Sequence, residues 1–348
     1  MTVGMDLGDR RSHYAVMDEA GGVVEEGRLA TRPAALRQRF EAMAPARIVI
    51  EAGAISGWVG RLLGELGHEV VVANPRRVAL VSGSADKSDP VDARTLARLG
   101  RADVQLLFPV VPRSAQTLAD RERLRAREAL VRCRTLLVNH TRSAVKGTGE
   151  RLPRCSAAAF AKRARGTLPQ ELRESLLPLL EEIASLTAAI RAFDPRLETL
   201  AQERYPQTEL FEPVKGVGIQ TALAFVLAIE DPRRFRSSRA VGSFLGLRPR
   251  RRQSGGSDPQ LRITKGGDKM ARRLLVTAAQ YILGPFGPDT DLRRFGLRLA
   301  TRGGKAAKKG AVVAVARKLA VMLHHLWLTG EAYEPLRSAK PAPEATAA

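Results

Sequence analysis

The chain has 348 residues, of which 44% are hydrophobic and 5% aromatic, a composition typical of a folded protein of two or three domains. Its 57 Lys and Arg residues outnumber its 36 Asp and Glu residues, and the formal net charge of +21, with a pI near 11.0, is the electrostatic signature of a nucleic-acid-binding protein. We expect a cytoplasmic protein, since no apolar run approaches the roughly 20 residues of a membrane span, no signal peptide opens the chain, and two cysteines are too few for a disulfide framework or a cysteine zinc site.

The first 108 residues predict alternating strands and helices. Short β-prone runs separated by glycine predict three antiparallel strands, and strands alternating with helices follow them. The predicted strands span 2–7, 13–17, 23–29, 47–51 and 69–73, and the predicted helices span 33–42 and 55–66, with a further helix opened by Asp89. This order predicts an α/β domain, a mixed sheet with helices on its faces, as in a ribonuclease-H-like fold.

Acidic residues close two of the predicted strands. Asp6 lies inside the first strand and Glu51 ends the fourth, each after an apolar run where a loop charge is not expected. In a ribonuclease-H-like sheet these strands are neighbours, and the helix that carries Asp89 and Asp92 on one face packs across them. Four converging carboxylates repel one another unless a cation lies between them, and all-oxygen ligands suit Mg²⁺ or Mn²⁺. The predicted catalytic metal ligands are Asp6, Glu51, Asp89 and Asp92.

The acids of the third helix also have a structural explanation. Pro90 suits the first helical position, Asp89 before it suits the N-cap, and Asp92 suits the first turn. Capping alone therefore accounts for this stretch. The two acids upstream favour the metal interpretation for the set of four, because two such ions about 3.5–4 Å apart activate an attacking oxygen and stabilise a leaving one in phosphoryl transfer.

Residues 109–205 predict a helical linker. The predicted helices span 115–146 and 170–193, with a loop at 147–166 between them. Long paired helices are typical of a coiled-coil-like spacer or dimerisation arm. The arginines of this arm face either solvent or nucleic acid, and the sequence leaves both open. Cys133 is predicted to lie in its core.

Residues 206–335 predict a mostly helical C-terminal domain. The turn Gly216-Val217-Gly218 precedes a helix over 220–229 and resembles a helix-hairpin-helix element, in which backbone N–H groups hold a phosphate; a tight connector is the alternative. A helix is predicted over 306–328, and its adjacent histidines point in different directions, which argues against a paired metal ligand. The Pro/Ala-rich tail at 336–348 is predicted to be disordered.

Residues 248–273 are rich in arginine and glycine. Ser254 stands between an arginine cluster and two glycines, where a turn can bring a phosphate close and arginines can clamp its oxygens. Its hydroxyl can attack phosphorus if something activates it, and no histidine stands beside it in the sequence. A flexible basic loop is the alternative; Ser257 is a close competitor as nucleophile, and Ser237 and Ser238 are more distant ones. The predicted nucleic-acid-binding residues are Lys215, Gly216, Gly218, Arg248, Arg250, Arg251, Arg252, Arg262, Lys265, Arg272 and Arg273.

Several of these motifs occur together and in a fixed order. They are Gly4-Met5-Asp6, Ile50-Glu51-Ala52, Asn74-Pro75-Arg76-Arg77-Val78, Lys87-Ser88-Asp89-Pro90-Val91-Asp92-Ala93-Arg94, Lys215-Gly216-Val217-Gly218, Phe235-Arg236-Ser237-Ser238, Phe244-Leu245-Gly246-Leu247-Arg248-Pro249, Ser254-Gly255-Gly256 and Ile263-Thr264-Lys265-Gly266-Gly267-Asp268. The set resembles the insertion-sequence 110 family of DNA transposases and the related Piv-type invertases, over roughly residues 2–285. That family usually carries threonine where Ser88 stands and a polar or charged residue where Pro90 stands.

The resemblance implies a specific machinery. The domain at 1–108 would have a RuvC-like fold with an Asp-Glu-Asp-Asp metal site, and the domain at 206–335 would supply Ser254 as nucleophile. Family members recombine DNA through a phosphoserine intermediate, and at least some use a structured bridge RNA that pairs with donor and target DNA. They work as dimers that assemble into tetramers, in which the serine of one subunit completes the metal site of another. The resemblance therefore implies a nucleoid-associated bacterial protein with DNA and bridge-RNA partners and no membrane partner.

Three functions follow from the sequence, in order of preference. The first is a site-specific DNA recombinase of an insertion sequence, in which Ser254 attacks the scissile phosphodiester. The second is a RuvC-like Holliday-junction endonuclease that uses metal-activated water and does not need the serine. The third is a non-enzymatic basic nucleic-acid-binding protein whose acids are helix caps.

Overall fold

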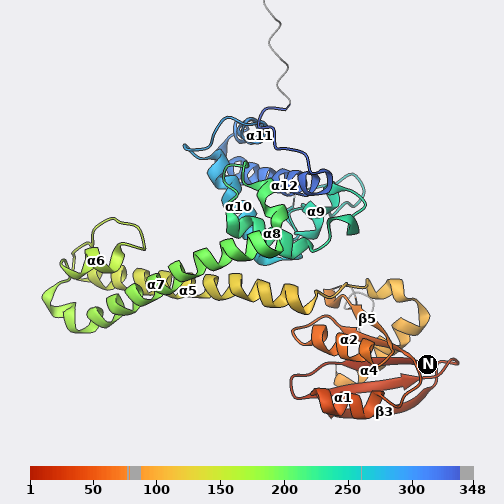
Figure 1. Ribbon diagram of the computed structural model, residues 1–348. Helices are drawn as coiled ribbons and strands as arrows, with labels where there is room; N and C mark the ends of the chain where they lie inside the picture. Colours follow the sequence, from red (N-terminus) through yellow and green to blue (C-terminus); the bar gives the residue numbers. More distant parts are fainter. Residues whose placement is uncertain (77, 79–87, 260, 338–348) are drawn as a thin grey trace, which may run out of the picture. The chain divides into compact units, whose positions relative to one another are not determined.

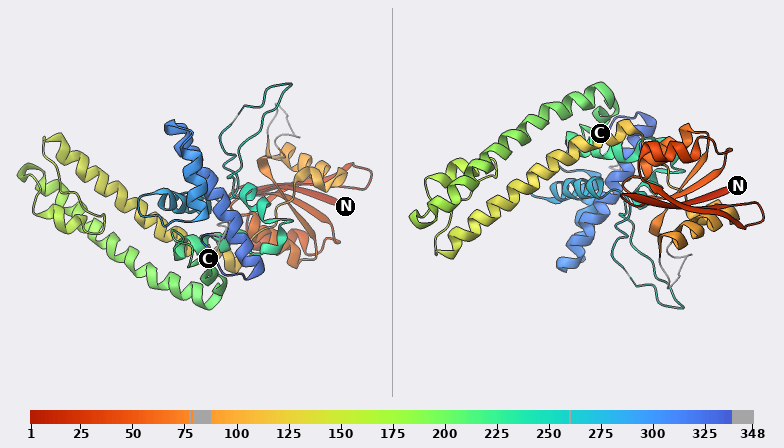
Figure 2. Two further views of the ribbon diagram at one scale, coloured as in Figure 1. Left: turned by 90° about the horizontal axis from the view of Figure 1, so that it is seen from above. Right: turned by 90° about the horizontal axis from the view of Figure 1, so that it is seen from below.

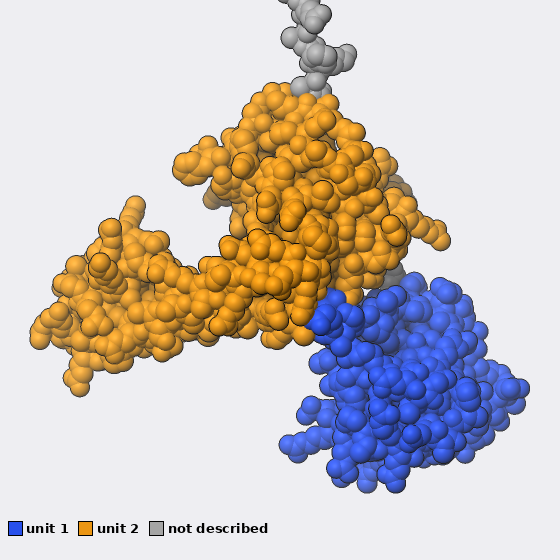
Figure 3. All heavy atoms as spheres, in the orientation of Figure 1, with its two compact units in different colours: residues 1–118 blue, residues 119–348 orange. Residues whose placement is uncertain are grey.

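The computed structural model describes residues 1–76, 78, 88–259 and 261–337. The chain forms two compact units, Met1–Leu118 and Ala119–Ala348, shown in two colours in Figure 3. Arg77 and Lys87 of the motifs above, and the tail predicted to be disordered from residue 338 on, lie outside the described residues.

A five-stranded mixed sheet forms the centre of the first unit (Figure 1). Its strands are β1 (Thr2–Asp6), β2 (Arg11–Met17), β3 (Val23–Ala30), β4 (Arg47–Glu51) and β5 (Glu69–Ala73). Their order across the sheet is β3-β2-β1-β4-β5, with β1 antiparallel to β2 and parallel to β4. The prediction of a mixed α/β domain built from three antiparallel strands and αβ units is therefore confirmed.

Different helices cover the two faces of this sheet. The helical segments are α1 (Pro33–Phe40), α2 (Ser56–Glu65), α4 (Asp89–Ala102) and the 3₁₀ helix η1 (Val104–Leu107). Met5 of β1 belongs to a buried cluster with Leu36 of α1 and Leu63 of α2. Val49 of β4 belongs to a separate cluster with Leu96 of α4. Because successive side chains of a strand point to opposite faces, α4 covers the face that α1 and α2 do not.

Helix α4 lies directly on the backbone of β1 at Gly4. A Cβ atom on Gly4 would lie 2.0 Å from the carbonyl oxygen of Ala93 and 2.4 Å from the backbone nitrogen of Ala97. Gly100 makes a second close approach, since a Cβ there would lie 2.3 Å from Cγ2 of Val49. Glycine at these two positions lets the helix and the sheet approach closely, and Ala93 brings the N-terminal part of α4 onto β1.

We expect Gly4→Ala to lower the free energy of unfolding by about 3 kcal/mol, which is the upper end of the usual cost of overpacking a core. The cost is high because backbone atoms, rather than a flexible side chain, would have to move to make room for the added Cβ. Gly64→Ala is the matched control: Gly64 lies in α2 with nothing within 4 Å of an added Cβ, and alanine should stabilise that helix by up to about 1 kcal/mol. Thermal unfolding followed by circular dichroism compares the two. Equal stability of both variants would contradict direct packing of α4 on Gly4.

Two long antiparallel helices, α5 (Ala115–Gly147) and α7 (Arg173–Arg204), lie side by side in Figures 1 and 2. Fully buried Asp120 near the start of α5 accepts hydrogen bonds from Arg204 Nη1 at 3.0 Å and from the Tyr205 hydroxyl at 2.9 Å. Burial, and then the hydrogen bond to Asp120, raises the pKa of Tyr205 to about 12. The Asp120 carboxylate therefore ties the start of α5 to the end of α7.

Helix α7 is longer than predicted and continues past Phe193 to Arg204, with Pro178 and Pro195 inside it. Each proline removes one backbone donor and so weakens the helix locally. Leu197 and Leu200, beyond the second proline, are 0% and 2% exposed in the main core of the unit. Burial of this apolar stripe therefore outweighs the local preference that favours an earlier end.

The far end of the α5–α7 pair has a small core of its own. Phe160 of α6 (Phe160–Arg165) is fully buried in a cluster with Val145 and Leu180. The segment predicted as a loop thus contains a helix, followed by the short 3₁₀ helix η2 (Gln170–Leu172). The prediction that Cys133 lies in the core of this arm is wrong, because its side chain is exposed.

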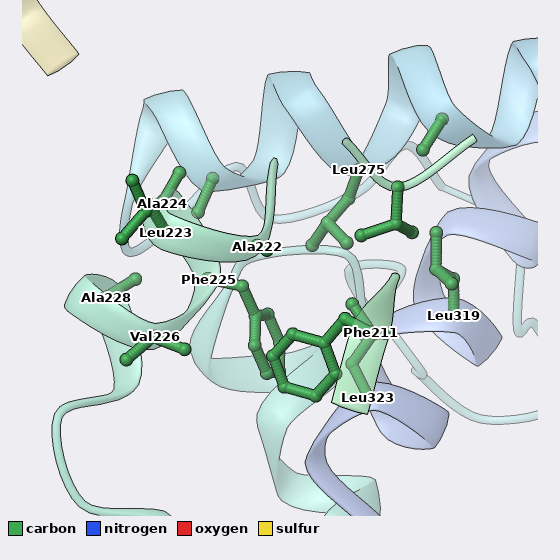
Figure 4. Packing of buried hydrophobic residues seen from close by; sticks show 14 of the residues in the cluster. Phe211, Ala222, Leu223, Ala224, Phe225, Val226, Ala228, Leu275, Leu319 and Leu323 are labelled. Carbon is green, nitrogen blue, oxygen red and sulfur yellow. The ribbon is translucent and has the colours of Figure 1, made fainter. Parts of the chain in front are cut away.

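A helical bundle makes up the rest of the second unit, in agreement with the predicted mostly helical C-terminal part. Its elements are η3 (Pro206–Phe211), α8 (Ile219–Ile229), η4 (Pro232–Arg234), α9 (Ser238–Phe244), α10 (Lys269–Leu283), α11 (Asp291–Ala300) and α12 (Gly304–Thr329). Figure 4 shows the core of this bundle, where the rings of Phe211 and Phe225 meet edge to face with centroids 5.8 Å apart. Every residue of α8 from Thr221 to Ile229 is buried, which makes α8 the central helix of the bundle.

Helix α12 corrects the expectation that no segment is long and apolar enough to cross a membrane. Within the described residues it is the one helix that passes by length and composition, with 26 residues and a mean hydropathy of 1.4 over its most apolar window. Val315, Leu319 and Leu323 of this helix are 0% exposed and belong to the bundle core. Its apolar character is therefore accounted for by packing inside a folded unit.

Candidate functional site

Asp6 and Glu51 end two neighbouring parallel strands at the same edge of the sheet. Strands β1 and β4 pair with Met5 opposite Ile50, and each acid is the next residue along its strand. Asp6 shares its face with Gly4, and Glu51 shares its face with Val49, because side chains of a strand alternate. Gly4 and Val49 both meet α4. The two carboxylates therefore lie side by side on the face that α4 covers, and both residues are half-buried.

The first turn of α4 brings the other two acids to this face. Asp92 is half-buried and precedes Ala93, whose carbonyl oxygen packs on Gly4. The capping interpretation of Asp89 is wrong: Ser88 occupies the N-cap, Asp89 is the first helical residue, and the Ser88 side chain makes no capping hydrogen bond. The Asp92 backbone N–H donates to the Ser88 carbonyl oxygen at 2.9 Å, which places Asp92 in the first turn of the helix.

His13 is a neighbour of these acids that sequence reasoning missed. It pairs with Asp6 across the β1–β2 hairpin, and directly paired residues of antiparallel strands point to the same face. Its Nδ1 lies 3.4 Å from Oδ2 of Asp89, and its side chain is 24% exposed. The signal that could have found it is the register of the first hairpin, which places residue 13 opposite residue 6.

The predicted serine lies on a two-stranded ribbon in the second unit. Hydrogen bonds of 2.9 Å join Arg250 N to Arg262 O and Thr264 N to Arg248 O at its base. At its tip Ser254 and Ser257 exchange two backbone hydrogen bonds of 3.1 Å around a two-glycine turn. Gly255 has φ of +54°, the sign that the first turn residue of a type II′ hairpin requires. Figure 2 shows this ribbon, coloured teal, extending away from the helices of its unit.

The comparison with known proteins gives the family. A DEDD transposase model of the IS110 group matches residues 3–149, and a model described as "Transposase IS116/IS110/IS902 family" matches residues 208–290. A putative transposase of Sinorhizobium fredii, y4pF/y4sB, is 30% identical over 305 residues, which cover 84% of this chain and 76% of that protein. The chain belongs to the IS110 family of DNA transposases.

Other relatives agree with this membership. A probable family 20 transposase of Pseudomonas aeruginosa is 29% identical over 298 residues, covering 84% of this chain and 86% of the relative. The pilin gene-inverting protein of Moraxella bovis is 27% identical over 256 residues, covering 72% of this chain and 70% of the relative. The protein is thus a DNA transposase, an enzyme of insertion-sequence recombination, and the non-enzymatic interpretation is wrong.

A DEDD transposase is expected to use a divalent metal, and the donor chemistry fits such an ion. Carboxylate oxygens at one edge and on one face of a sheet suit Mg²⁺ or Mn²⁺. Within the residues that the structure describes, no three His, Cys, Asp or Glu side chains gather closely enough to hold an ion. The four acids would therefore hold an ion only if metal binding drew their oxygens together.

The predicted cationic residues of the transposase fall into two groups. Six have exposed side chains and form no ion pair with an acid among the described residues: Lys215, Arg248, Arg250, Arg252, Arg262 and Lys265. Three others have structural contacts. Arg251 pairs with Asp258 at 3.2 Å, and Arg273 pairs with Glu128 at 3.1 Å. Arg272 Nη1 donates to the backbone carbonyls of Leu245 and Gly266. The exposed group carries the charge that is most available to phosphates.

The glycine-rich motif near the ribbon packs backbone against backbone. A Cβ on Gly246 would lie 2.3 Å from the Gly266 carbonyl oxygen, and one on Gly267 would lie 1.9 Å from the Phe244 carbonyl oxygen. Both glycines have positive φ. Asp268, which ends the motif, caps α10 by accepting from Ala271 N–H at 2.8 Å and pairs with buried Arg121. This motif therefore anchors the base of the ribbon.

The Gly216-Val217-Gly218 turn connects η3 to α8. Val214 and Val217 are buried in the bundle core, whereas Lys215 and Gly218 are exposed. Gly216 has φ of +96°, and a Cβ there would lie 3.0 Å from Cδ1 of Tyr281. The turn thus presents an exposed lysine at the N-terminus of α8.

One serine of the transposase has a histidine beside it. Ser238 Oγ lies 2.9 Å from Nδ1 of His324, whose Nε2 lies 2.8 Å from the carbonyl oxygen of Pro232. When Nε2 carries the proton and donates to that carbonyl, Nδ1 accepts from the Ser238 hydroxyl. Burial lowers the pKa of His324, which is 0% exposed. Both ring nitrogens of His324 thus have hydrogen-bond partners, as is typical of a structural histidine in a protein core. Ser238 is also a useful comparison for Ser254 as a candidate nucleophile.

Proposed function

We propose that this transposase cuts and rejoins DNA through a phosphoserine intermediate formed on Ser254, with assistance from a Mg²⁺-binding site at Asp6, Glu51, Asp89 and Asp92. The observation that carries the proposal is that Asp6 and Glu51 end neighbouring strands on the face of the sheet that α4 covers, while the first turn of α4 carries Asp89 and Asp92. The order of β1 to β5 and the placement of α4 support a RuvC-like fold for residues 1–108. Residues 109–205 would be the linker arm, and residues 206–335 the serine domain.

The proposed reaction has two balanced steps. The Ser254 oxygen attacks the scissile phosphorus, a bond from Oγ to phosphorus forms, and the bond from phosphorus to the DNA 3′ oxygen breaks. The serine proton is transferred to the departing oxygen, which leaves as a free 3′-hydroxyl. The 3′-hydroxyl of a second DNA strand then attacks the phosphoserine and restores the serine. A bound divalent cation would stabilise the charge on the attacking and leaving oxygens.

The ribbon supports the serine assignment through its exposure and charge. Ser254 is exposed at the tip, and the exposed residues Arg252 and Arg250 stand two and four residues before it in the chain. These arginines can hold the phosphate oxygens while the hydroxyl attacks. Ser257 points to the same face as Ser254, because the two residues are directly paired, so both hydroxyls are candidates to be separated by experiment.

The proposed partners are donor DNA, target DNA and a bridge RNA, held by the cations of the serine domain. The net charge of +21 supports backbone binding by the protein while base pairing would read the sequence. Assembly of a homodimer into a tetramer would let the serine of one subunit reach the acids of another. The protein would act in the bacterial cytoplasm at the nucleoid.

A junction endonuclease that uses water in place of serine is the second candidate, because the same four acids would serve it. Trapping of a covalent complex separates the two functions. We expect the wild-type protein, incubated with its DNA substrate and Mg²⁺, to leave a protein–DNA adduct on a denaturing gel, and EDTA to prevent it. Cleavage products without any adduct, at short and long times, would favour the endonuclease.

A further inference from the structure

An open cavity of about 410 Å³ lies between α5 and α7, and none of the predicted site residues lines it. Its walls carry Arg123 from α5 and Phe193, Arg196 and Thr199 from α7. The three α7 residues follow one another at intervals of three, so they share one face of the helix. The hydrogen bonds from Arg204 and Tyr205 to Asp120 fix how the two helices pair beside this cavity.

The positive charges of the two arginines of the cavity are only weakly paired with carboxylates. The Arg123 side chain is 47% exposed, and Nε lies 3.8 Å from Asp120, whose oxygens already accept from Arg204 and Tyr205. The Arg196 guanidinium lies 5.8 Å from the centre of the Phe193 ring. Among the residues that the structure describes, no carboxylate forms an ion pair with Arg196. The cavity is therefore cationic and has an aromatic wall.

We propose that this cavity binds one nucleotide of a single-stranded nucleic acid, with its base stacked on Phe193 and its phosphate held by Arg123 and Arg196. Bases of single strands stack on aromatic side chains and on guanidinium planes, whereas the bases of a duplex are already stacked. An acidic protein segment would use the two arginines but would leave the ring without a role. The inference rests on the proposed function only in taking nucleic acid as the partner.

Fluorescence anisotropy with labelled single strands of about 20 nucleotides tests this site. The full-length protein carries Ser254→Ala in every sample, so that no cleavage accompanies binding. We expect Phe193→Leu to weaken binding about tenfold, the loss of one stacking contact, and Phe193→Tyr to restore it. Arg196→Gln should weaken binding several-fold. It should also reduce the slope of log K against log salt concentration by about the amount that one phosphate contact contributes. The matched control is Arg132→Gln, which removes the same charge from an exposed position on α5.

The outcomes distinguish the possible partners. A loss in Phe193→Leu on RNA identifies RNA as the source of the nucleotide, and the same loss on DNA identifies DNA. Unchanged binding in Phe193→Leu, an equal loss in Arg132→Gln, or a loss confined to duplexes overturns the proposal. A melting temperature that falls in Phe193→Leu but not in Phe193→Tyr, with binding equal in both, would also overturn it. Because the readout is binding alone, failure of the Ser254 chemistry would leave this site standing.

Discussion

Replacing Ser254 by alanine is expected to remove the covalent protein–DNA adduct and to lower the rate of recombination by about 10⁴-fold or more, the scale on which loss of a nucleophile acts. Ser254 is exposed at the tip of its ribbon, and its backbone hydrogen bonds to Ser257 do not need the hydroxyl. The variant should therefore fold and bind DNA as the wild type does. Denaturing gel electrophoresis detects the adduct, and gel shift measures binding.

Two further serine variants sharpen this test. Ser257→Ala removes the hydroxyl that faces the same side of the turn, and Ser238→Ala removes the hydroxyl beside His324. We expect both to retain the adduct. If the adduct persists in Ser254→Ala and disappears in Ser257→Ala, the nucleophile is Ser257. If only Ser238→Ala abolishes it, the reaction uses the imidazole of His324 as a base, and the ribbon serves DNA binding alone.

The sequence predicts the first unit well because its local signals agree with its tertiary structure. Short strands end at glycine turns, and the apolar run of β4 ends at Glu51, so element type and order follow from periodicity alone. The place of His13 beside Asp89 does not follow, because it depends on the register of β1 with β2 and on how close α4 lies to Gly4. Such distances are set by packing rather than by propensity.

The second unit is predicted less completely. Helix α7 continues through Pro195 because Leu197 and Leu200 are buried beyond it, and α6 forms because Phe160 has a core to enter. Neither contact is visible from local sequence. The glycines at 246 and 267 belong to motifs that carry the family resemblance, and the structure gives them a packing role at the base of the ribbon. A motif can therefore carry the scaffold of a site as well as its chemistry.

Replacing Asp92 by asparagine is expected to lower the rate of DNA cleavage by about 10²–10³-fold or more, the scale on which one lost electrostatic contact to the reacting groups acts. Asp92 is half-buried in the first turn of α4, and asparagine keeps its shape while removing the charge that would hold Mg²⁺. DNA binding should persist or strengthen, because the variant removes a negative charge from a protein of net charge +21. Cleavage rates and Mn²⁺ binding by calorimetry are measured together.

Glu65→Gln provides the matched control for Asp92→Asn, since it removes one negative charge from an exposed residue of α2 in the same unit. Its cleavage rate and Mn²⁺ affinity should equal those of the wild type. Asp6→Asn should behave as Asp92→Asn does, because Asp6 ends β1 on the face that α4 covers. Full cleavage by either variant, or unchanged Mn²⁺ binding in both, would show that the acids of this face do not form one metal site, and the serine would then need another source of activation.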